Sequence, residues 1–446
     1  DSSGRLLERN DDSRPEGSDR GSNEVFGEGN RDSYVDYTFT APGTYYLGVG
    51  KFPSNPVPGL VQLDGTVPDP ADRYTLHLSI DQRNSLNPNQ SANSGLFAQS
   101  TAPGGAAGTI NLNARQVSLQ NDARISASTT SGQSGSIQLN NLETLQVQNS
   151  LISVSTENGT AGDILVNASQ SVQLSGTLPN GSRGGLLAEA TQGGSAGSMQ
   201  INTAQLTIDT GAQATVSSTA SGTAGALDIT ATSVTLSNNA RLAAETQQGS
   251  GGDIQLQGLQ TLQLTGNSQI SASTIDGQGG TLSVAAARSI NLSGNSSLLA
   301  RATGNGSAVA LSVTTGQLTL EQAEISTSTA GQGNAGKIAI QANALDLARG
   351  SRVTSLSSGT GNAGSITINL RDRLTASAST ISAASERGGG GQIAITAQDI
   401  RLRRSSPVTS SVFDGAGGGG SISFSSNIFI ALEDSDILAN AVFGGG

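Results

Sequence analysis

Carboxylates are the main side chains in this chain that could do chemistry, and their spacing does not favour catalysis. The 446 residues include no Cys, which excludes disulfides and thiolate metal sites. Cleavage of a polysaccharide would need two or three carboxylates adjacent across neighbouring structural units. Asp163, Asp228 and Asp253 are predicted to share one corner position, but intervening units have Ser or Thr there. The densest acidic stretch, Glu433-Asp434-Ser435-Asp436, lies in the last unit, so we expect no catalytic residues and no enzyme.

These acids belong to a repeat of roughly 27 to 29 residues that runs from residue 108 to 446. Each unit reads Gly-x-Ile-x-Ile, then two further short apolar pairs, then a corner rich in Gly, Ser and Thr. Self-similarity at this period is typical of a solenoid, in which each unit buries its apolar face against its neighbours. The first apolar residues of the twelve units are Ile110, Ile137, Ile164, Met199, Leu227, Ile254, Leu282, Leu311, Ile338, Ile366, Ile393 and Ile422.

Apolar and polar residues alternate within each unit, which is the periodicity of strands and not of helices. Three short strands in about 27 residues leave no room for a helix, so the fold class predicted is all-β: a right-handed parallel β-helix of about twelve coils. Two positions after the first column stands a second apolar column, from Leu112 to Phe424. Stacking at about 4.8 Å per coil predicts a rod roughly 55–60 Å long.

Two departures from the repeat carry expectations of their own. The third apolar pair often ends in a small residue, as at Ala127, Thr327, Ser355 and Ala383, so we expect one side of the core to be thin. The unit of Ile164 is longer than its neighbours, and the excess lies at residues 176–185. Insertions in a solenoid form corner loops, so this loop is either a contact surface or a tolerated decoration.

Composition and charge exclude several classes of partner. The formal net charge is −11 and aromatic residues make up 3% of the chain, so a basic stripe with interleaved aromatics is missing and no nucleic acid is expected. Arg401, Arg403 and Arg404 form the densest basic stretch, and the first two are expected to face solvent beside inward Ile400 and Leu402. No apolar run approaches the ~20 residues that a membrane span needs.

The first 81 residues differ from the array: they are richer in charge, Tyr and Pro, and they read as antiparallel strands. An Asp-x-x-Gly strand at residue 1, an Asn-Asp-Asp turn at residue 10, an Ala-Pro-Gly-Thr-Tyr-Tyr block and a Tyr-Thr-Leu strand resemble the bacterial pre-peptidase C-terminal domain. That resemblance implies a small β-sandwich over residues 1–81. The family's earlier strands are missing here, so we expect either an incomplete sandwich or a fragment of a longer chain. Residues 82–107 are expected to be a linker and a partial capping coil.

The same resemblance implies a calcium site, because some members of that family bind Ca²⁺ through acidic turns. The matching positions are Asn10, Asp11, Asp12 and Asp32. Clustered oxygen ligands suit Ca²⁺, which takes six to eight of them. The alternative is that Asp and Asn are present simply as turn formers. His77, the one histidine, is expected to face solvent on its strand.

The array itself resembles the β-helical repeats of filamentous-haemagglutinin-type exoproteins. The resemblance lies in the Gly-x-Ile-x-Ile units and in corners such as Ala161-Gly162-Asp163, Ala335-Gly336-Lys337 and Ala363-Gly364-Ser365. It implies export by two-partner secretion through an outer-membrane partner, to the surface of a Gram-negative bacterium. The function implied is a non-catalytic adhesin or structural rod that contacts surface glycans or proteins. The alternative is a polysaccharide-active β-helix enzyme, a lyase or a glycoside hydrolase.

Overall fold

A computed structural model describes residues 55–56, 63–64, 95–100, 104–414 and 418–442, and these residues form strands, turns and bends without any helix. The chain divides into two compact units, Asp1–Ala92 and Asn93–Gly446. In the first unit, the described residues form one antiparallel pair, β1 (Asn55–Pro56) with β2 (Leu63–Asp64). The other strands predicted for residues 1–81 lie outside the described residues.

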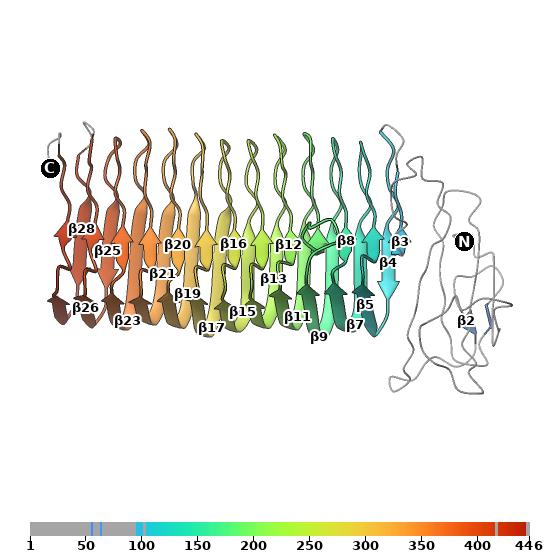
Figure 1. Ribbon diagram of the computed structural model, residues 1–446, viewed down its shortest axis with the longest axis horizontal. Coiled ribbons are helices and arrows are strands. Elements are labelled where there is room, and N and C mark those ends of the chain that lie inside the picture. The colour runs from blue at the N-terminus through green and yellow to red at the C-terminus, as the bar shows by residue number, and fades with distance from the viewer. Residues whose placement is uncertain (1–54, 57–62, 65–94, 101–103, 415–417, 443–446) are drawn as a thin grey trace. The chain divides into compact units, whose positions relative to one another are not determined.

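The second unit is a parallel β-solenoid, as the repeat predicted. Figure 1 shows its coils stacked side by side, each giving a long strand to one sheet and a short strand to another. The long-strand sheet contains β4 (Ile110–Asn113), β5 (Gln116–Gln120), β7 (Ile137–Gln148), β9 (Ile164–Ser175), β11 (Met199–Asp209), β13 (Leu227–Leu236), β15 (Ile254–Leu264), β17 (Thr281–Ser293), β19 (Ala310–Glu321), β21 (Lys337–Ala348), β23 (Ser365–Ser377), β25 (Gln392–Thr396), β26 (Asp399–Arg403), β28 (Ser421–Ser425) and β29 (Ile428–Ala431). The short-strand sheet contains β3 (Gly95–Phe97), β6 (Arg124–Ser126), β8 (Leu151–Ser153), β10 (Gly185–Leu187), β12 (Gln213–Thr215), β14 (Arg241–Ala243), β16 (Gln269–Ser271), β18 (Ser297–Leu299), β20 (Glu324–Ser326), β22 (Arg352–Thr354), β24 (Thr380–Ser382), β27 (Val408–Thr409) and β30 (Ile437–Leu438).

The predicted apolar columns are confirmed by the strand register. Each of the twelve leading residues, from Ile110 to Ile422, pairs with its counterpart in an adjacent coil. Leu311, whose unit lacks the usual leading Gly, pairs with Leu282 and Ile338. Fully burying one such side chain stabilises the fold by about 1.5–3 kcal/mol, so the columns are the main source of stability.

The third side of the core is thin, also as predicted. Ala127, Thr327, Ser355 and Ala383 are all 0% exposed. The two polar residues among them are bonded inside the core: Thr327 Oγ1 donates to Ser355 Oγ at 3.0 Å, and Ser355 Oγ donates to the carbonyl of Gly336 at 2.6 Å. Small side chains therefore let the short strands approach the long-strand sheet without leaving an unpaired polar atom.

The corners explain the glycine content of the repeat. At Gly225 an added Cβ would lie 1.9 Å from the carbonyl oxygen of Gly197 in the coil before, so no larger residue fits. The opposite corner, between each long strand and the following short strand, uses left-handed backbone, for example at Asn149 (φ 47°) and Asn267 (φ 61°). Asn and Gly tolerate this conformation best, which is why they recur there.

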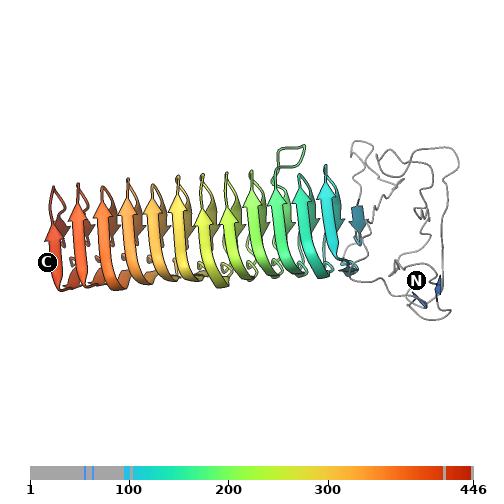
Figure 2. The same ribbon diagram turned by 90° about the horizontal axis from the view of Figure 1, so that it is seen from below.

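The insertion at residues 176–185 forms a corner loop, as expected. Thr177 and Arg183 pair as an antiparallel bridge, and Leu178 is 6% exposed. The Arg183 guanidinium donates to the backbone carbonyls of Gly211 and Asn239, which belong to the next two coils. Figure 2 shows the loop, in green, projecting beyond the other corner turns. It is thus a small hairpin fastened along the rod.

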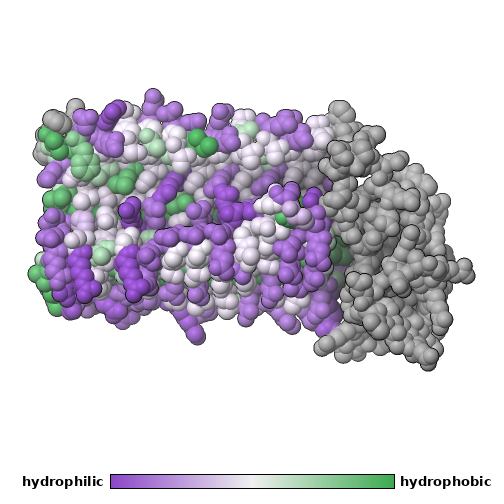
Figure 3. Space-filling model, in the orientation of Figure 1, coloured by the Kyte–Doolittle hydropathy of each residue, from purple (hydrophilic) through white to green (hydrophobic). Residues whose placement is uncertain are grey.

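The last coil differs from the others in its exposure. Its strands β28, β29 and β30 each pair on one side, with β25, β26 and β27. Large apolar side chains of this coil are consequently exposed, among them Ile428 (48%), Leu432 (52%) and Val442 (57%). In Figure 3 apolar surface gathers at this end of the rod, whereas the flanks are mainly polar.

Candidate functional site

The predicted calcium ligands Asn10, Asp11, Asp12 and Asp32 lie outside the described residues, and so does His77. The calcium site therefore stays a prediction. Within the described ranges, no group of three or more His, Cys, Asp or Glu residues is placed to hold a metal ion.

The carboxylates of the corner positions do not come together. Asp163 and Asp253 stand just before their long strands, where each side chain accepts the backbone N–H of the next coil: from Ser198 at 2.8 Å and from Thr281 at 2.9 Å. The expectation that Asp228 shares this corner is wrong. It lies within β13, in register with Gln200 and Gln255, because it follows the first apolar residue instead of preceding it.

The basic and acidic stretches near the C-terminus form surface ion pairs. Arg401 pairs with Asp399 at 2.7 Å, and the side-chain hydrogen bond followed by the charge of Asp399 raises the pKa of Arg401. Arg403 pairs with Glu433 at 2.7 Å, and this hydrogen bond is the main cause that lowers the pKa of Glu433. The expectation that Arg401 and Arg403 face solvent is confirmed. Glu433 forms an ion pair with an arginine of the preceding coil.

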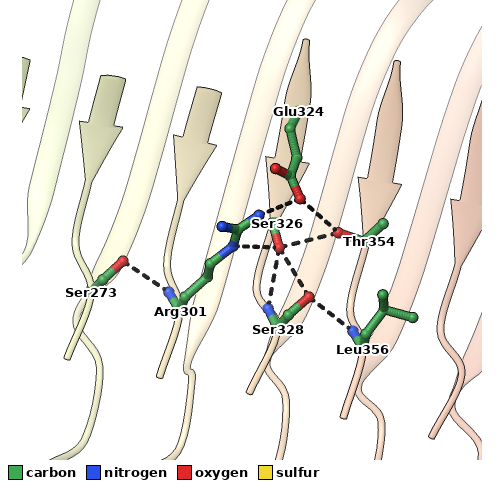
Figure 4. Close-up of polar contacts among 7 residues, drawn as sticks. All are labelled: Ser273, Arg301, Glu324, Ser326, Ser328, Thr354 and Leu356. Carbon is green, nitrogen blue, oxygen red and sulfur yellow. Dashed lines mark hydrogen bonds and ion pairs between the residues drawn. The ribbon is translucent and has the colours of Figure 1, made fainter. Parts of the chain in front are cut away.

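Hydroxyl groups form rows along the outer face of the short-strand sheet, but they are bonded to one another. Ser326 Oγ lies 3.0 Å from Ser328 Oγ within one coil, and Thr354 Oγ1 of the next coil donates to Ser326 Oγ at 3.1 Å (Figure 4). Across the described residues, Ser357 Oγ is the one buried side-chain polar atom without a hydrogen-bond partner. The hydroxyls of this face are therefore largely engaged in the fold.

A second column of serines accepts hydrogen bonds from backbone N–H groups of the next coil. At these positions the serine hydroxyl takes the place of a backbone carbonyl as the acceptor. Ser328 Oγ accepts the N–H of Leu356 in the next coil at 3.1 Å (Figure 4). The same bond recurs from Ser155 to Ser128, from Glu245 to Ser217, from Arg301 to Ser273 and from Asn440 to Ser411. These serines thus continue the ladder beyond the ends of the short strands.

Charged residues are embedded in this hydroxyl face as pairs. Arg301 contacts Glu324 of the next coil, and its Nε donates to Ser326 Oγ at 2.9 Å (Figure 4). Glu324 also accepts a hydrogen bond from Thr354 at 3.3 Å. Arg241 forms a similarly half-buried ion pair, but with Glu245 of its own coil, four residues along the chain. Half-buried ion pairs of this kind neutralise each other and leave little free charge.

Glu189 is the exception among these acids. It follows β10 and stands one coil before Ser217, which in turn stands one coil before Glu245. Burial raises the pKa of Glu189 to about 7, and neither the hydrogen bond with Thr215 nor the charge of Arg241 offsets this. Arg241 is engaged with Glu245, so Glu189 has no ion-pair partner of its own among the described residues. Nothing in the repeat pattern pointed to this residue.

Side-chain amides are frequent on the outer face of the long-strand sheet, together with Ser and Thr. One row, here called the amide row, contains Gln146, Gln173, Thr207, Thr235, Gln263 and Asn291 in register. Its four amide side chains are exposed and make no hydrogen bond to the described residues. The row therefore offers free donors and acceptors in two pairs of adjacent coils, Gln146 with Gln173 and Gln263 with Asn291, about 4.8 Å apart within each pair.

No protein-family model, curated protein or solved structure matches the chain. The functional argument therefore rests on the fold and on the arrangement of its side chains. Among the described residues, no helix is long and apolar enough to cross a membrane.

Removing one of the ladder serines should destabilise the rod. In Ser328→Ala the N–H of Leu356 loses its acceptor, which costs about 1–3 kcal/mol when the group cannot reach water. Thermal unfolding followed by circular dichroism measures this. Ser233→Ala removes an equally half-buried serine without such a bond and is the control. Equal melting temperatures for the two variants would contradict the role given to Ser328.

Glu189 should make stability fall as pH rises. Its folded-state pKa of about 7 exceeds the ordinary 4.5, so the folded state binds the proton more tightly and loses that advantage between pH 4.5 and 7. The loss is at most on the order of 3 kcal/mol, because each pKa unit is worth about 1.4 kcal/mol and the side chain is partly exposed. The melting temperature of Glu189→Gln minus that of wild type should therefore increase as pH rises. Parallel curves, as expected for the exposed control Glu386→Gln, would contradict this.

Proposed function

We propose that the protein is a non-catalytic adhesive rod on the outside of the cell, of the filamentous-haemagglutinin type, which binds glycans on a neighbouring surface. One observation carries the proposal: the four amide side chains of the amide row are exposed and free of internal hydrogen bonds, whereas the hydroxyl rows of the other face are bonded within the fold. Amides at a fixed spacing bind repeating hydroxyl-rich ligands through many weak contacts, whose combined strength exceeds that of each contact.

The stiffness of the rod supports the same proposal. Successive coils are joined by backbone hydrogen bonds and by apolar columns, so the row keeps its spacing when a ligand binds. A preorganised surface loses little conformational entropy on association. Export through an outer-membrane partner is part of the proposal and rests on the resemblance of the repeats.

A glycan array probed with the full chain tests this function. We expect wild type to bind, and the triple variant Gln146→Ala, Gln173→Ala, Gln263→Ala to bind at least about tenfold more weakly, because each lost hydrogen bond contributes about 0.5–1.5 kcal/mol. The control variant removes three exposed glutamines outside the row: Gln247→Ala, Gln248→Ala, Gln332→Ala. Absence of binding by wild type, or equal loss in both triple variants, would refute the proposal.

A second candidate function, cleavage of a polysaccharide, is favoured by Glu189 alone. A carboxylic acid with a pKa near 7 can donate a proton at neutral pH, and Glu245 stands two coils away as a possible base. Release of reducing ends or of unsaturated sugars from a panel of polysaccharides measures such activity. An enzyme of this kind should lose at least about 100-fold in rate as Glu189→Gln, since general acid catalysis contributes that much or more. An inactive wild type would eliminate this candidate.

A further inference from the structure

A shallow depression lies on the long-strand sheet, near the middle of three consecutive long strands. Its volume is about 370 Å³, and it is lined by residues of β19, β21 and β23. Small-molecule sites in proteins have volumes of about 300–1,000 Å³, so the space is adequate for a small ligand. The depression is open to solvent, which suits a unit of a longer chain better than an enclosed metabolite.

The floor of the depression is set by a column of inward residues. Thr315, Ala342 and Leu370 stand in register in adjacent coils, and Leu259 lies further along the same column. Thr315 and Leu370 are 8% and 5% exposed, whereas the small Ala342 between them leaves its surroundings partly open. The floor is therefore mainly apolar and hollowed at Ala342.

The rim carries amides that the fold does not use. Gln341, Asn343 and Asn369 are exposed and make no hydrogen bond to the described residues. Earlier in the rod the corresponding position is engaged: Asn202 donates to Asn167 at 2.8 Å, and Asn167 donates to Asn140 at 2.9 Å. The amides at the depression are thus free, although the same part of the repeat can bond internally.

A β-bulge brings a cation to this rim. Between β21 and β23 the register slips by one residue, so that Arg371 and Asp372 together face the single residue Asn343. Bulges commonly re-aim side chains in this way. Arg371 is exposed, with 78% of its side chain accessible, and its contact with Asp372 is long, at 4.0 Å. A pair so exposed is weak in water, so the guanidinium can exchange it for a ligand.

We propose that this depression binds a carboxylated sugar, a uronic or sialic acid unit of a glycan. The apolar floor packs against the C–H face of the ring, the free amides bond its hydroxyls, and Arg371 bonds the carboxylate, for which its planar fork is suited. The inference rests on the proposed function, because it names the glycan class that one part of the rod takes.

Calorimetric titration of the full chain with trigalacturonate and its methyl ester tests the charge requirement. We expect the acid to bind and the ester to bind about tenfold more weakly, because the charge-assisted hydrogen bond is lost. Arg371→Gln should reduce trigalacturonate affinity about tenfold, and Asp372→Asn should raise it about threefold by removing the competing carboxylate. Arg349→Gln is the matched control, since Arg349 is 73% exposed and paired with Glu321 outside the depression. Sialyllactose against lactose separates a sialic acid ligand from a uronate.

Ala342→Leu tests the floor independently of charge. Leu259 and Leu370 already occupy this column, so the larger residue fits the fold, and an unchanged melting temperature verifies that. It should abolish binding of both acidic probes. The proposed site is refuted if the ester binds as tightly as the acid. It is also refuted if Arg371→Gln binds trigalacturonate no more weakly than Arg349→Gln does. Wild type that binds neutral glycans but neither acidic probe overturns this inference and leaves the proposed function standing; wild type that binds no glycan overturns both.

Discussion

In-register stacking of one coil on the next is the constraint on which the structure depends. A single coil has too little apolar surface to fold alone, so its Ile, Leu and Val side chains are buried by the coils before and after it. This constraint explains why Leu311 keeps its register without a leading glycine. It also explains why Gly225 can carry no side chain, since the backbone of the previous coil occupies that space.

The same stacking turns every outward position into a row, and hydrogen bonding within the row decides whether it can bind anything else. On the short-strand sheet, the hydroxyls of Ser326 and Ser328 bond each other and the next coil, so this face mainly holds the rod together. On the long-strand sheet, Gln146 and its counterparts project freely. The polar surface thus combines a structural face with a second face, on which some side chains bond one another, such as Asn167 and Asn202, and others are available to ligands.

Local irregularities add chemistry to an otherwise uniform rod. The hairpin at residues 176–185 is fastened by Arg183 to two later coils, and the bulge in β23 re-aims Arg371. Burial leaves Glu189 with a pKa near 7 beside an arginine that is paired elsewhere. The hairpin occurs in one coil, whereas register shifts recur near the middle of several long strands and differ in the side chains that they carry. A solenoid can thus acquire a distinct site without disturbing its neighbours.

The sequence by itself determined the all-β class, the apolar columns of twelve residues each and the corner insertion, because the 27-residue period and the alternation within it place residues such as Ile137 and Ile164 one above the other. It misplaced Asp228, since a shift of one position moves a side chain from corner to strand. Only the tertiary structure decided which polar groups are free. Whether Ser328, Glu189 or Asn343 has a partner depends on residues one or two coils away, and the linear pattern does not specify the geometry of those contacts.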